Sequence, residues 1–249
     1  MRQMEASWYD GDKINRSRSR VDRLGYFDEV TIETPVVAGT TDQVDLNVNV
    51  KERPTGNVMI GAGFSSTEKF TLSGSVQQQN LFGSGKHVGV SVNTSKSNQV
   101  YSFSYTDPYY TVDGISRGFD IYKRDTNTSS LAVGTYGSSS MGAGVRYGLP
   151  ISDDDSVNFG LSGDSTKLNV TSSSPQRYQD YVREQGENST TLLTTAGWAR
   201  DTLDSRIYPT KGKSHRVGGE LALPGGKLRY YRATYQHQRF IPVGRKYTL

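Results

Sequence analysis

The strongest constraint on this chain is a two-residue alternation of apolar with small or polar residues, which begins at Val58 and recurs to the C-terminal end. In the first run, alternate residues share one face of an extended strand: Val58, Ile60, Ala62 and Phe64. The residues between them share the other face: Met59, Gly61, Gly63 and Ser65. A period of two is the pattern of a β-strand, not of a helix.

The same alternation returns in later runs, at residues 70–77, 88–93, 101–105, 119–121, 141–149, 157–161, 192–198, 215–223 and 228–240. Runs of this length at hairpin spacing predict a meandering antiparallel sheet of about ten strands. One face of this sheet is apolar and the other is rich in Gly, Ser, Thr and Asn.

Composition narrows what such a sheet can be. Only 33% of the 249 residues are apolar and 27 are Gly, which is poor for a two-layer soluble core. The 16 Tyr and 8 Phe argue against disorder. Two interpretations stay open from the pattern: a transmembrane barrel whose apolar face meets lipid, or a soluble sandwich whose apolar face meets a second sheet. Small residues on one face and Tyr near the strand ends favour the barrel.

The connections between the runs fall into two alternating classes. One class is turn-like, with Pro or aromatic residues, at 80–86, 107–116, 150–156, 201–213 and 242–246. The other is polar and variable in length, at 65–69, 95–99, 125–139 and 164–189. Alternation of the two classes predicts that each lies at its own end of the sheet, with the second class outside the cell.

The first 53 residues differ from the rest. Asp12 is expected to cap a helix that ends near Leu24, and extended runs follow at 29–36 and 43–50. Pro54 and Gly56 then interrupt regular structure. We therefore expect one domain at 1–53, a hinge at 54–57 and a second domain at 58–249. The first is too small to close its own core and the last run stops as a strand begins, so we expect an internal segment of a longer protein.

Several kinds of chemistry find no support in the residues. The chain has no Cys, which excludes thiolate metal sites, and its net charge of +4 indicates a mildly basic surface, not a nucleic-acid site. It has no apolar run of 18 residues, so we expect no transmembrane helix, and its first residues lack the apolar region by which we would expect a signal peptide to be recognised.

The residues that could carry catalysis or bind a ligand do not occur in the spacing that such sites need. The three histidines, His87, His215 and His237, lack metal-ligand spacing, and residues 153–155 lack the pattern of a calcium loop. No Gly-x-Ser-x-Gly motif is present. We expect no enzyme activity, no cofactor and no metal.

Five short motifs occur in order along the chain. They are Leu-Gly-Tyr-Phe-Asp-Glu-Val at 24–30, Val-Lys-Glu-Arg-Pro-Thr-Gly at 50–56, Gln-Asn-Leu-Phe-Gly-Ser-Gly at 79–85, Thr-Asp-Pro-Tyr-Tyr at 106–110, and Arg-Asp-Thr at 200–202 with Tyr-Pro-Thr-Lys-Gly at 208–212. The set resembles the BamA family of outer-membrane-protein assembly factors, within the polypeptide-transport barrels. The turn residues that carry this resemblance are Asn80, Gly83, Gly85, Pro108, Tyr109, Arg200, Asp201, Pro209 and Gly212.

The resemblance implies a mainly β fold. A partial α/β POTRA module would be followed by about the first ten strands of a sixteen-stranded antiparallel transmembrane β-barrel. The Val-Arg-Gly-Phe motif that the family carries later in the barrel is not found in this sequence. The barrel would lie in the outer membrane of a Gram-negative cell, with the POTRA part in the periplasm.

The resemblance also implies a function: folding nascent outer-membrane proteins and inserting them into outer-membrane lipid. The expected site is the seam strand, Asn57 to Ser65, whose glycines would let the seam with the last strand open as a template for client strands. Those glycines could instead only accommodate packing on the wet face. Glu5 matches a position that faces Bam-complex lipoproteins, BamD especially. The alternatives are a two-partner-type secretion pore and a soluble β-rich adhesin or binding module.

Overall fold

The computed structural model describes residues 3–22, 24–128, 135–152, 154–204 and 209–243. The chain divides into two compact units, Met1–Gly56 and Asn57–Leu249. The first strand of the second unit begins at Gly56, so the expected hinge at 54–57 overlaps the start of that strand.

The first unit consists of one helix and one strand pair: α1 (Gly11–Asp22), β1 (Phe27–Glu33) and β2 (Asn47–Glu52). The expected cap was wrong by two residues. Asp10 caps α1, because its carboxylate oxygen Oδ1 accepts hydrogen bonds from the amides of Asp12 (3.0 Å) and Lys13 (3.1 Å). These bonds and the Lys13 ammonium lower the pKa of Asp10 below its usual value.

The two strands of this unit are antiparallel, with Val30 opposite Val50 and Ile32 opposite Val48. Helix α1 packs on β1, where Ile14, Tyr26 and Val30 are buried. Both strands are shifted from the expected ranges, 29–36 and 43–50. The distal part of that alternation forms only an isolated bridge between residues 36 and 44.

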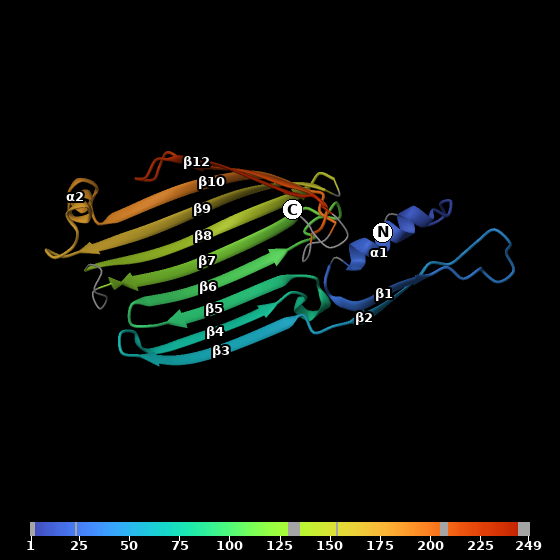
Figure 1. Cartoon of the computed structure of the whole chain (residues 1–249), viewed down its shortest axis with the longest axis horizontal. Helices are drawn as coiled ribbons and strands as arrows, with labels where there is room; N and C mark the ends of the chain where they lie inside the picture. Colours follow the sequence, from blue (N-terminus) through green and yellow to red (C-terminus); the bar gives the residue numbers. More distant parts are fainter. Residues whose placement is uncertain (1–2, 23, 129–134, 153, 205–208, 244–249) are drawn as a thin grey trace. The chain divides into compact units, whose positions relative to one another are not determined.

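The second unit is one ten-stranded antiparallel sheet, and its strand order is the order of the chain (Figure 1). The strands are β3 (Gly56–Ser65), β4 (Lys69–Gln78), β5 (His87–Thr94), β6 (Asn98–Asp107), β7 (Ser116–Asn127), β8 (Tyr136–Pro150), β9 (Asp155–Val170), β10 (Asn188–Asp201), β11 (Gly212–Ala222) and β12 (Tyr231–Phe240). The expected number of strands and their meandering order are confirmed.

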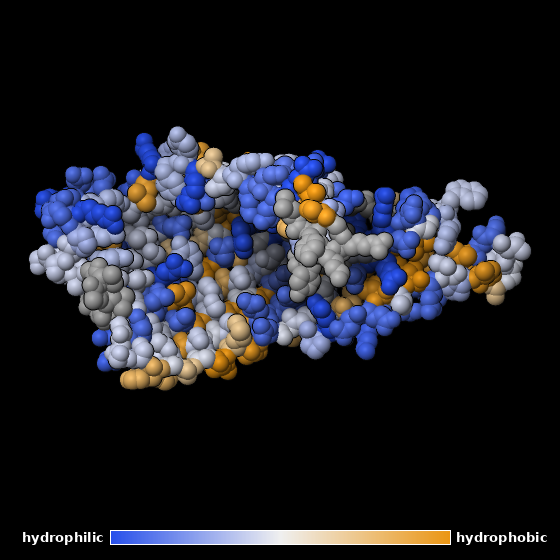
Figure 2. All heavy atoms as spheres, viewed as in Figure 1, coloured by the Kyte–Doolittle hydropathy of each residue, from blue (hydrophilic) through white to orange (hydrophobic). Residues whose placement is uncertain are grey.

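One face of this sheet is apolar and uncovered. Side chains in register lie on the same face, and one row runs from Val90 through Phe103 and Ile121 to Ala143. Phe159, on the same face, is 50% exposed. Among the described residues of this unit the buried apolar side chain is Ala222, so burial within this unit contributes little to stability. Figure 2 shows apolar atoms gathered along the edge that β3 forms.

The opposite face, called the polar face below, carries glycines beside polar side chains. One register row on it consists of Ser116, Gly148, Asn158, Gly197, Gly218 and Thr234, on six successive strands. A Cβ at Gly197 would lie 2.2 Å from Asn158 Oδ1, and one at Gly218 would lie 2.8 Å from Thr234 Oγ1. The polar side chains therefore occupy the space that a side chain at the neighbouring glycine would need.

The connections separate to two ends of the sheet, as the sequence predicts. Of the described residues, the turn end carries 79–86, 108–115, 151–152, 154, 202–204 and 209–211, and the loop end carries 66–68, 95–97, 128, 135, 171–187 and 223–230. The short 3-10 helix η1 (Leu81–Gly83) belongs to the turn end. Helix α2 (Gln176–Gln185) belongs to the loop end (Figure 1), where the sequence was expected to form only a polar loop.

No helix in the described ranges is long and apolar enough to cross a membrane.

Candidate functional site: the seam strand and the turn end of the sheet

The expected seam strand is β3, and it forms one edge of the ten-stranded sheet. Of its ten residues only Gly61 is partly shielded, and the rest are exposed. Ile60 is 82% exposed and Phe64 is 77% exposed. One side of β3 pairs with β4, and in this sheet its other side has no neighbouring strand.

The two glycines of β3 make specific contacts with β4. A Cβ at Gly61 would lie 2.7 Å from Ser73 Oγ, and one at Gly63 would lie 2.9 Å from Thr71 Oγ1. The Ser73 hydroxyl also donates a long hydrogen bond, 3.4 Å, to the Gly61 carbonyl oxygen. These contacts support the packing interpretation of the glycines.

The motif at 79–85 forms a compact turn between β4 and β5. The side-chain oxygen of Asn80 accepts a hydrogen bond from the Gly85 amide at 2.7 Å. Gly83 (φ 74°) and Gly85 (φ 70°) lie in the left-handed region that glycine adopts most readily. The three residues of this motif therefore set the shape of the turn.

The motif at 106–110 begins the turn between β6 and β7. Asp107 Oδ1 accepts a hydrogen bond from the Tyr109 amide (3.2 Å), and Pro108 lines a hollow at this end of the sheet. The Asp107 carboxylate is 3.8 Å from the Lys86 ammonium, so this turn is linked to the preceding one.

The motif at 200–212 joins β10 to β11. Arg200 and Asp201 end β10, and Asp201 Oδ1 accepts a hydrogen bond from the Leu203 amide (3.0 Å). Gly212 (φ 119°) begins β11, and a Cβ there would lie 2.3 Å from the Thr202 carbonyl oxygen. Pro209 is described and lies between these elements; residues 205–208, including the motif's Tyr208, lie outside the described residues.

Sequence reasoning missed Asp204, which holds this turn together. Its carboxylate accepts hydrogen bonds from the Thr210 hydroxyl, the Thr210 amide (2.9 Å) and the Lys211 amide (3.1 Å). These bonds, that of the Thr210 hydroxyl first, lower the pKa of Asp204 to about 2. An Asp followed within a few residues by Pro and Thr in a turn is a signal that could have found it.

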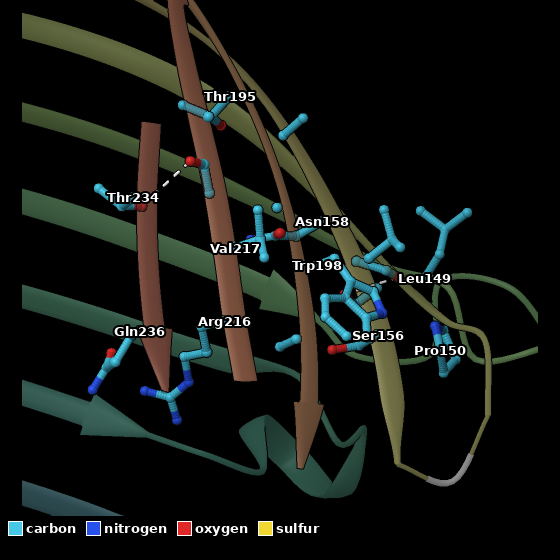
Figure 3. Close-up of a pocket in the computed structure, with 18 of the residues that line it drawn as sticks. Leu149, Pro150, Ser156, Asn158, Thr195, Trp198, Arg216, Val217, Thr234 and Gln236 are labelled. Atoms are coloured by element: carbon cyan, nitrogen blue, oxygen red, sulfur yellow. Dashed lines mark hydrogen bonds between the residues drawn. The ribbon is translucent and has the colours of Figure 1, made fainter. Parts of the chain in front are cut away.

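A hollow of about 720 Å³ lies at the turn end, lined by residues of the glycine-rich register row. Figure 3 shows Thr195, Asn158, Arg216 and Gln236 around it, and the hydrogen bond of Thr234 to the Gly218 carbonyl oxygen (3.4 Å). The lining carries hydroxyl and amide groups, the guanidinium group of Arg216 and the carboxylate of Glu220, together with apolar side chains such as Leu149 and Trp198. These groups form no arrangement typical of a catalytic site.

The remaining expected residues are placed as follows. Glu5 is exposed in a turn ahead of α1. His87 lies far along the sheet from the other two histidines, but His215 and His237 are register partners with ring centroids 4.4 Å apart. The sequence predicted no metal-ligand spacing for the three histidines and did not indicate that two of them are neighbours across β11 and β12. In the described part of the chain no cluster of His, Cys, Asp and Glu could hold a metal ion.

Comparison with known protein families identifies the class of this chain. The Omp85 superfamily domain matches residues 80–249, and POTRA, described as a surface antigen variable number repeat, matches residues 1–53. The chain belongs to the Omp85 superfamily.

Among curated relatives, the chain is 39% identical over 259 residues to the outer membrane protein assembly factor BamA of Neisseria meningitidis, covering 100% of this chain and 32% of that protein. It is 29% identical to BamA of Nitratidesulfovibrio vulgaris, covering 92% of this chain and 27% of that protein. The chain thus spans about a third of the length of these relatives.

Among solved structures, the chain is similar to BamA from Haemophilus ducreyi lacking POTRA domains 1–3, with a TM-score of 0.71 and 28% identity over 99% of this chain and 48% of that one. It is also similar to CdiB from Acinetobacter baumannii, with a TM-score of 0.58 and 15% identity over 90% of this chain and 43% of that one. The second likeness shows a shared fold.

These findings decide between the two interpretations of the alternating strands. The second unit is part of an outer-membrane β-barrel, and the first is POTRA sequence on the periplasmic side, as in the BamA homologues. A soluble adhesin is not supported. The uncovered apolar face agrees with this, because lipid can cover it.

Proposed function

We propose that the protein containing this chain folds and inserts outer-membrane β-barrel proteins, and that β3 serves as the template strand at a lateral seam. Support comes from the names of the relatives, which are assembly factors, and from the position of β3 at an edge of the sheet. In this proposal residues 1–53 are the end of the last POTRA module, 54–57 the hinge and 58–249 the first part of the barrel.

The physical argument rests on the unpaired edge of β3. In hydrocarbon, each unpaired backbone N–H or C=O group costs several kcal/mol, so an edge strand in the membrane must find a partner. In a complete barrel that partner is the last strand. Because Gly61 and Gly63 contribute no side chains to the seam, fewer contacts hold it closed and a client strand can replace the last strand by β-augmentation.

The test is a seam that can be locked in the complete protein. Ile60→Cys is paired with a cysteine introduced opposite it in the last strand, and assembly of client barrels is measured before and after reduction. The control locks a pair inside the sheet, Val76→Cys with Val90→Cys, which are register partners on β4 and β5. We expect the seam disulfide alone to stop assembly and reductant to restore it. Client assembly at the normal rate with the seam oxidised would overturn the proposal.

The proposed partners are nascent outer-membrane proteins, the lipid around the barrel and a BamD-type lipoprotein that contacts Glu5. Glu5 is exposed and has no hydrogen bond or ion pair among the described residues, so its carboxylate can accept one from a partner. Glu5→Lys is expected to reduce co-purification of the lipoprotein, whereas Glu33→Lys, an exposed position on β1, is not. Equal recovery with both variants would remove Glu5 from the interface.

We further propose that this activity is not enzymatic, since templated insertion requires no covalent step. The same seam-locking experiment distinguishes the secretion-pore alternative. A secretion pore would export one soluble substrate, and locking its seam would leave the insertion of client barrels unchanged. The likeness to CdiB, at 15% identity, supports a common fold and does not favour that alternative.

A further inference from the structure

Basic side chains gather on the apolar face of the sheet at the turn end of β10, β11 and β12. Register pairing places them in two adjacent rows. Lys213 is opposite Arg239, and His215 is opposite both His237 and Arg200. Each lies within four residues of the end of its strand. These five residues are called the basic rim below.

A ring contact lies at the centre of the basic rim. The His215 and His237 rings are 4.4 Å apart, and the register places Arg200 in the same row and Lys213 with Arg239 in the adjacent row. A hydrogen bond of 3.2 Å joins His215 Nδ1 to the hydroxyl of Tyr235, one row further from the strand ends.

The cations of the basic rim lack the partners that other cations at the turn end have. Lys86 pairs with Asp107 at 3.8 Å, and Arg117 stacks 3.7 Å over the Tyr110 ring. Within the described ranges, no carboxylate lies within ion-pair distance of Lys213, Arg200 or Arg239.

The carboxylates near the rim are occupied or face elsewhere. Asp155 is in register with Arg200 and accepts a hydrogen bond from the Ser152 hydroxyl at 3.0 Å. Asp201 lies on the polar face, in register with Ser214, and Asp204 binds the amides of its own turn. Lys213, Arg200 and Arg239 are therefore three cations without an ion-pair partner among the described residues, and Asp155, in register with Arg200, is the carboxylate on the same face beside them.

Moving away from the strand ends, the character of this face changes in a fixed order. The row after the basic rim is Trp198, Val217 and Tyr235, and the next is Ala196, Gly219 and Ala233. Cations, then amphipathic aromatics, then apolar or small residues is the order that matches phosphates, the headgroup boundary and acyl chains of a bilayer.

We propose that the basic rim is a binding site for the phosphate headgroup of an anionic phospholipid in the leaflet at the turn end. Lys213, Arg200 and Arg239 contact the phosphate, and Trp198 and Tyr235 lie at the headgroup boundary. The site requires that the apolar face meets lipid, and it does not depend on the proposed assembly activity.

The test measures lipid selectivity of the complete protein in nanodiscs of mixed phosphatidylcholine and phosphatidylglycerol, by native mass spectrometry of the lipids it retains. Arg239→Gln is expected to lower the preference for phosphatidylglycerol about fivefold, and Arg239→Gln with Lys213→Gln to lower it further. Arg239→Lys keeps the charge and should keep the preference. The matched control is Arg216→Gln, which removes an arginine from the polar face of β11, one residue from His215.

Two results would overturn the proposal. One is an Arg216→Gln variant that loses the preference as strongly as Arg239→Gln, which would mean that only net charge matters. The other is displacement of retained phosphatidylglycerol by millimolar glycerol phosphate in solution, which would show a site for free phosphate and not for lipid. The folding of each variant is checked by the change in its electrophoretic mobility on heating. If a variant with Gln in place of a cation does not fold, Arg239→Lys still tests the site, because it keeps the charge.

Discussion

Tyr122 and Asp164 are hydrogen-bonded through the Tyr122 hydroxyl although a whole strand lies between them. The residue between them, on β8, is Gly142, which is the register partner of both. A Cβ at Gly142 would lie 2.2 Å from Asp164 Oδ1 and 2.7 Å from Tyr122 Cε1. The glycine therefore provides the space in which two polar side chains meet on the polar face.

This relationship predicts the effect of one methyl group. Gly142→Ala should destabilise the barrel by roughly 1–3 kcal/mol, because the tyrosine ring and the carboxylate must both move. Urea unfolding of the complete protein in detergent measures it. Gly163→Ala on β9 is the control, since nothing lies within 4 Å of its Cβ position. Equal effects at the two positions would show that loss of glycine, and not the crossing side chains, matters.

The glycines of β3 allow packing and seam roles to be separated. Gly61→Ala should reduce client assembly and slightly reduce stability, since its methyl group meets the Ser73 hydroxyl. Adding Ser73→Ala removes that hydroxyl and should restore stability. If assembly remains reduced in the stable double variant, Gly61 acts at the seam. If assembly recovers together with stability, the glycine serves packing alone.

Alanine substitutions at Gly212 and Gly225 distinguish the cost of backbone strain from the cost of steric overlap. Both have positive φ, 119° and 122°, but a Cβ at Gly212 would lie 2.3 Å from the Thr202 carbonyl oxygen, whereas nothing lies within 4 Å at Gly225. Gly225→Ala should cost about 1–3 kcal/mol from strain, and Gly212→Ala clearly more. The denaturant midpoints of the two variants measure the difference. Identical midpoints would mean that the β10–β11 turn relaxes freely.

The hydrogen bonds of Asp204 predict how the β10–β11 turn responds to acid. The pKa of this group is lowered from 3.8 to about 2, so its contribution is complete above pH 3.8 and is lost as the pH falls through about 2. Hydrogen exchange should show the Thr210 and Lys211 amides protected at pH 4 and released near pH 2. In Asp204→Asn they should already exchange faster at pH 4. Protection that is unchanged in this variant would contradict the assignment.

The parts of the fold that depend on a repeating pattern within a short stretch of sequence could be predicted. Alternation over β3 to β12 predicts the strands and the two faces, because a shift of one residue would move every apolar side chain to the wrong face. Helix α2 was missed, although Tyr178, Tyr181 and Val182 have helical spacing, because a single short apolar stripe in a polar segment is a weak signal. The cap of α1 was placed two residues late because Asp10 and Asp12 are both suitable capping residues.

The basic rim and the histidine pair could not be predicted in the same way. Whether His215 meets His237 depends on the length of the connection at 223–230 and on the register it sets, and neither is contained in a local pattern. The turn motifs were recognisable because glycines with positive φ and Asn or Asp side chains have strong positional preferences.

The strand order of the sheet has a consequence for how the barrel forms. Each pairing from β3 to β12 joins strands that follow one another along the chain, so each can form as soon as its own hairpin is made, with little loop entropy to overcome. Joining the first strand to the last is different, because it must bring together the two most distant parts of the barrel. Closure is thus expected to be the slowest pairing, and the outer edge of β3, on the side away from β4, would be the last strand edge to find a partner during the protein's own folding.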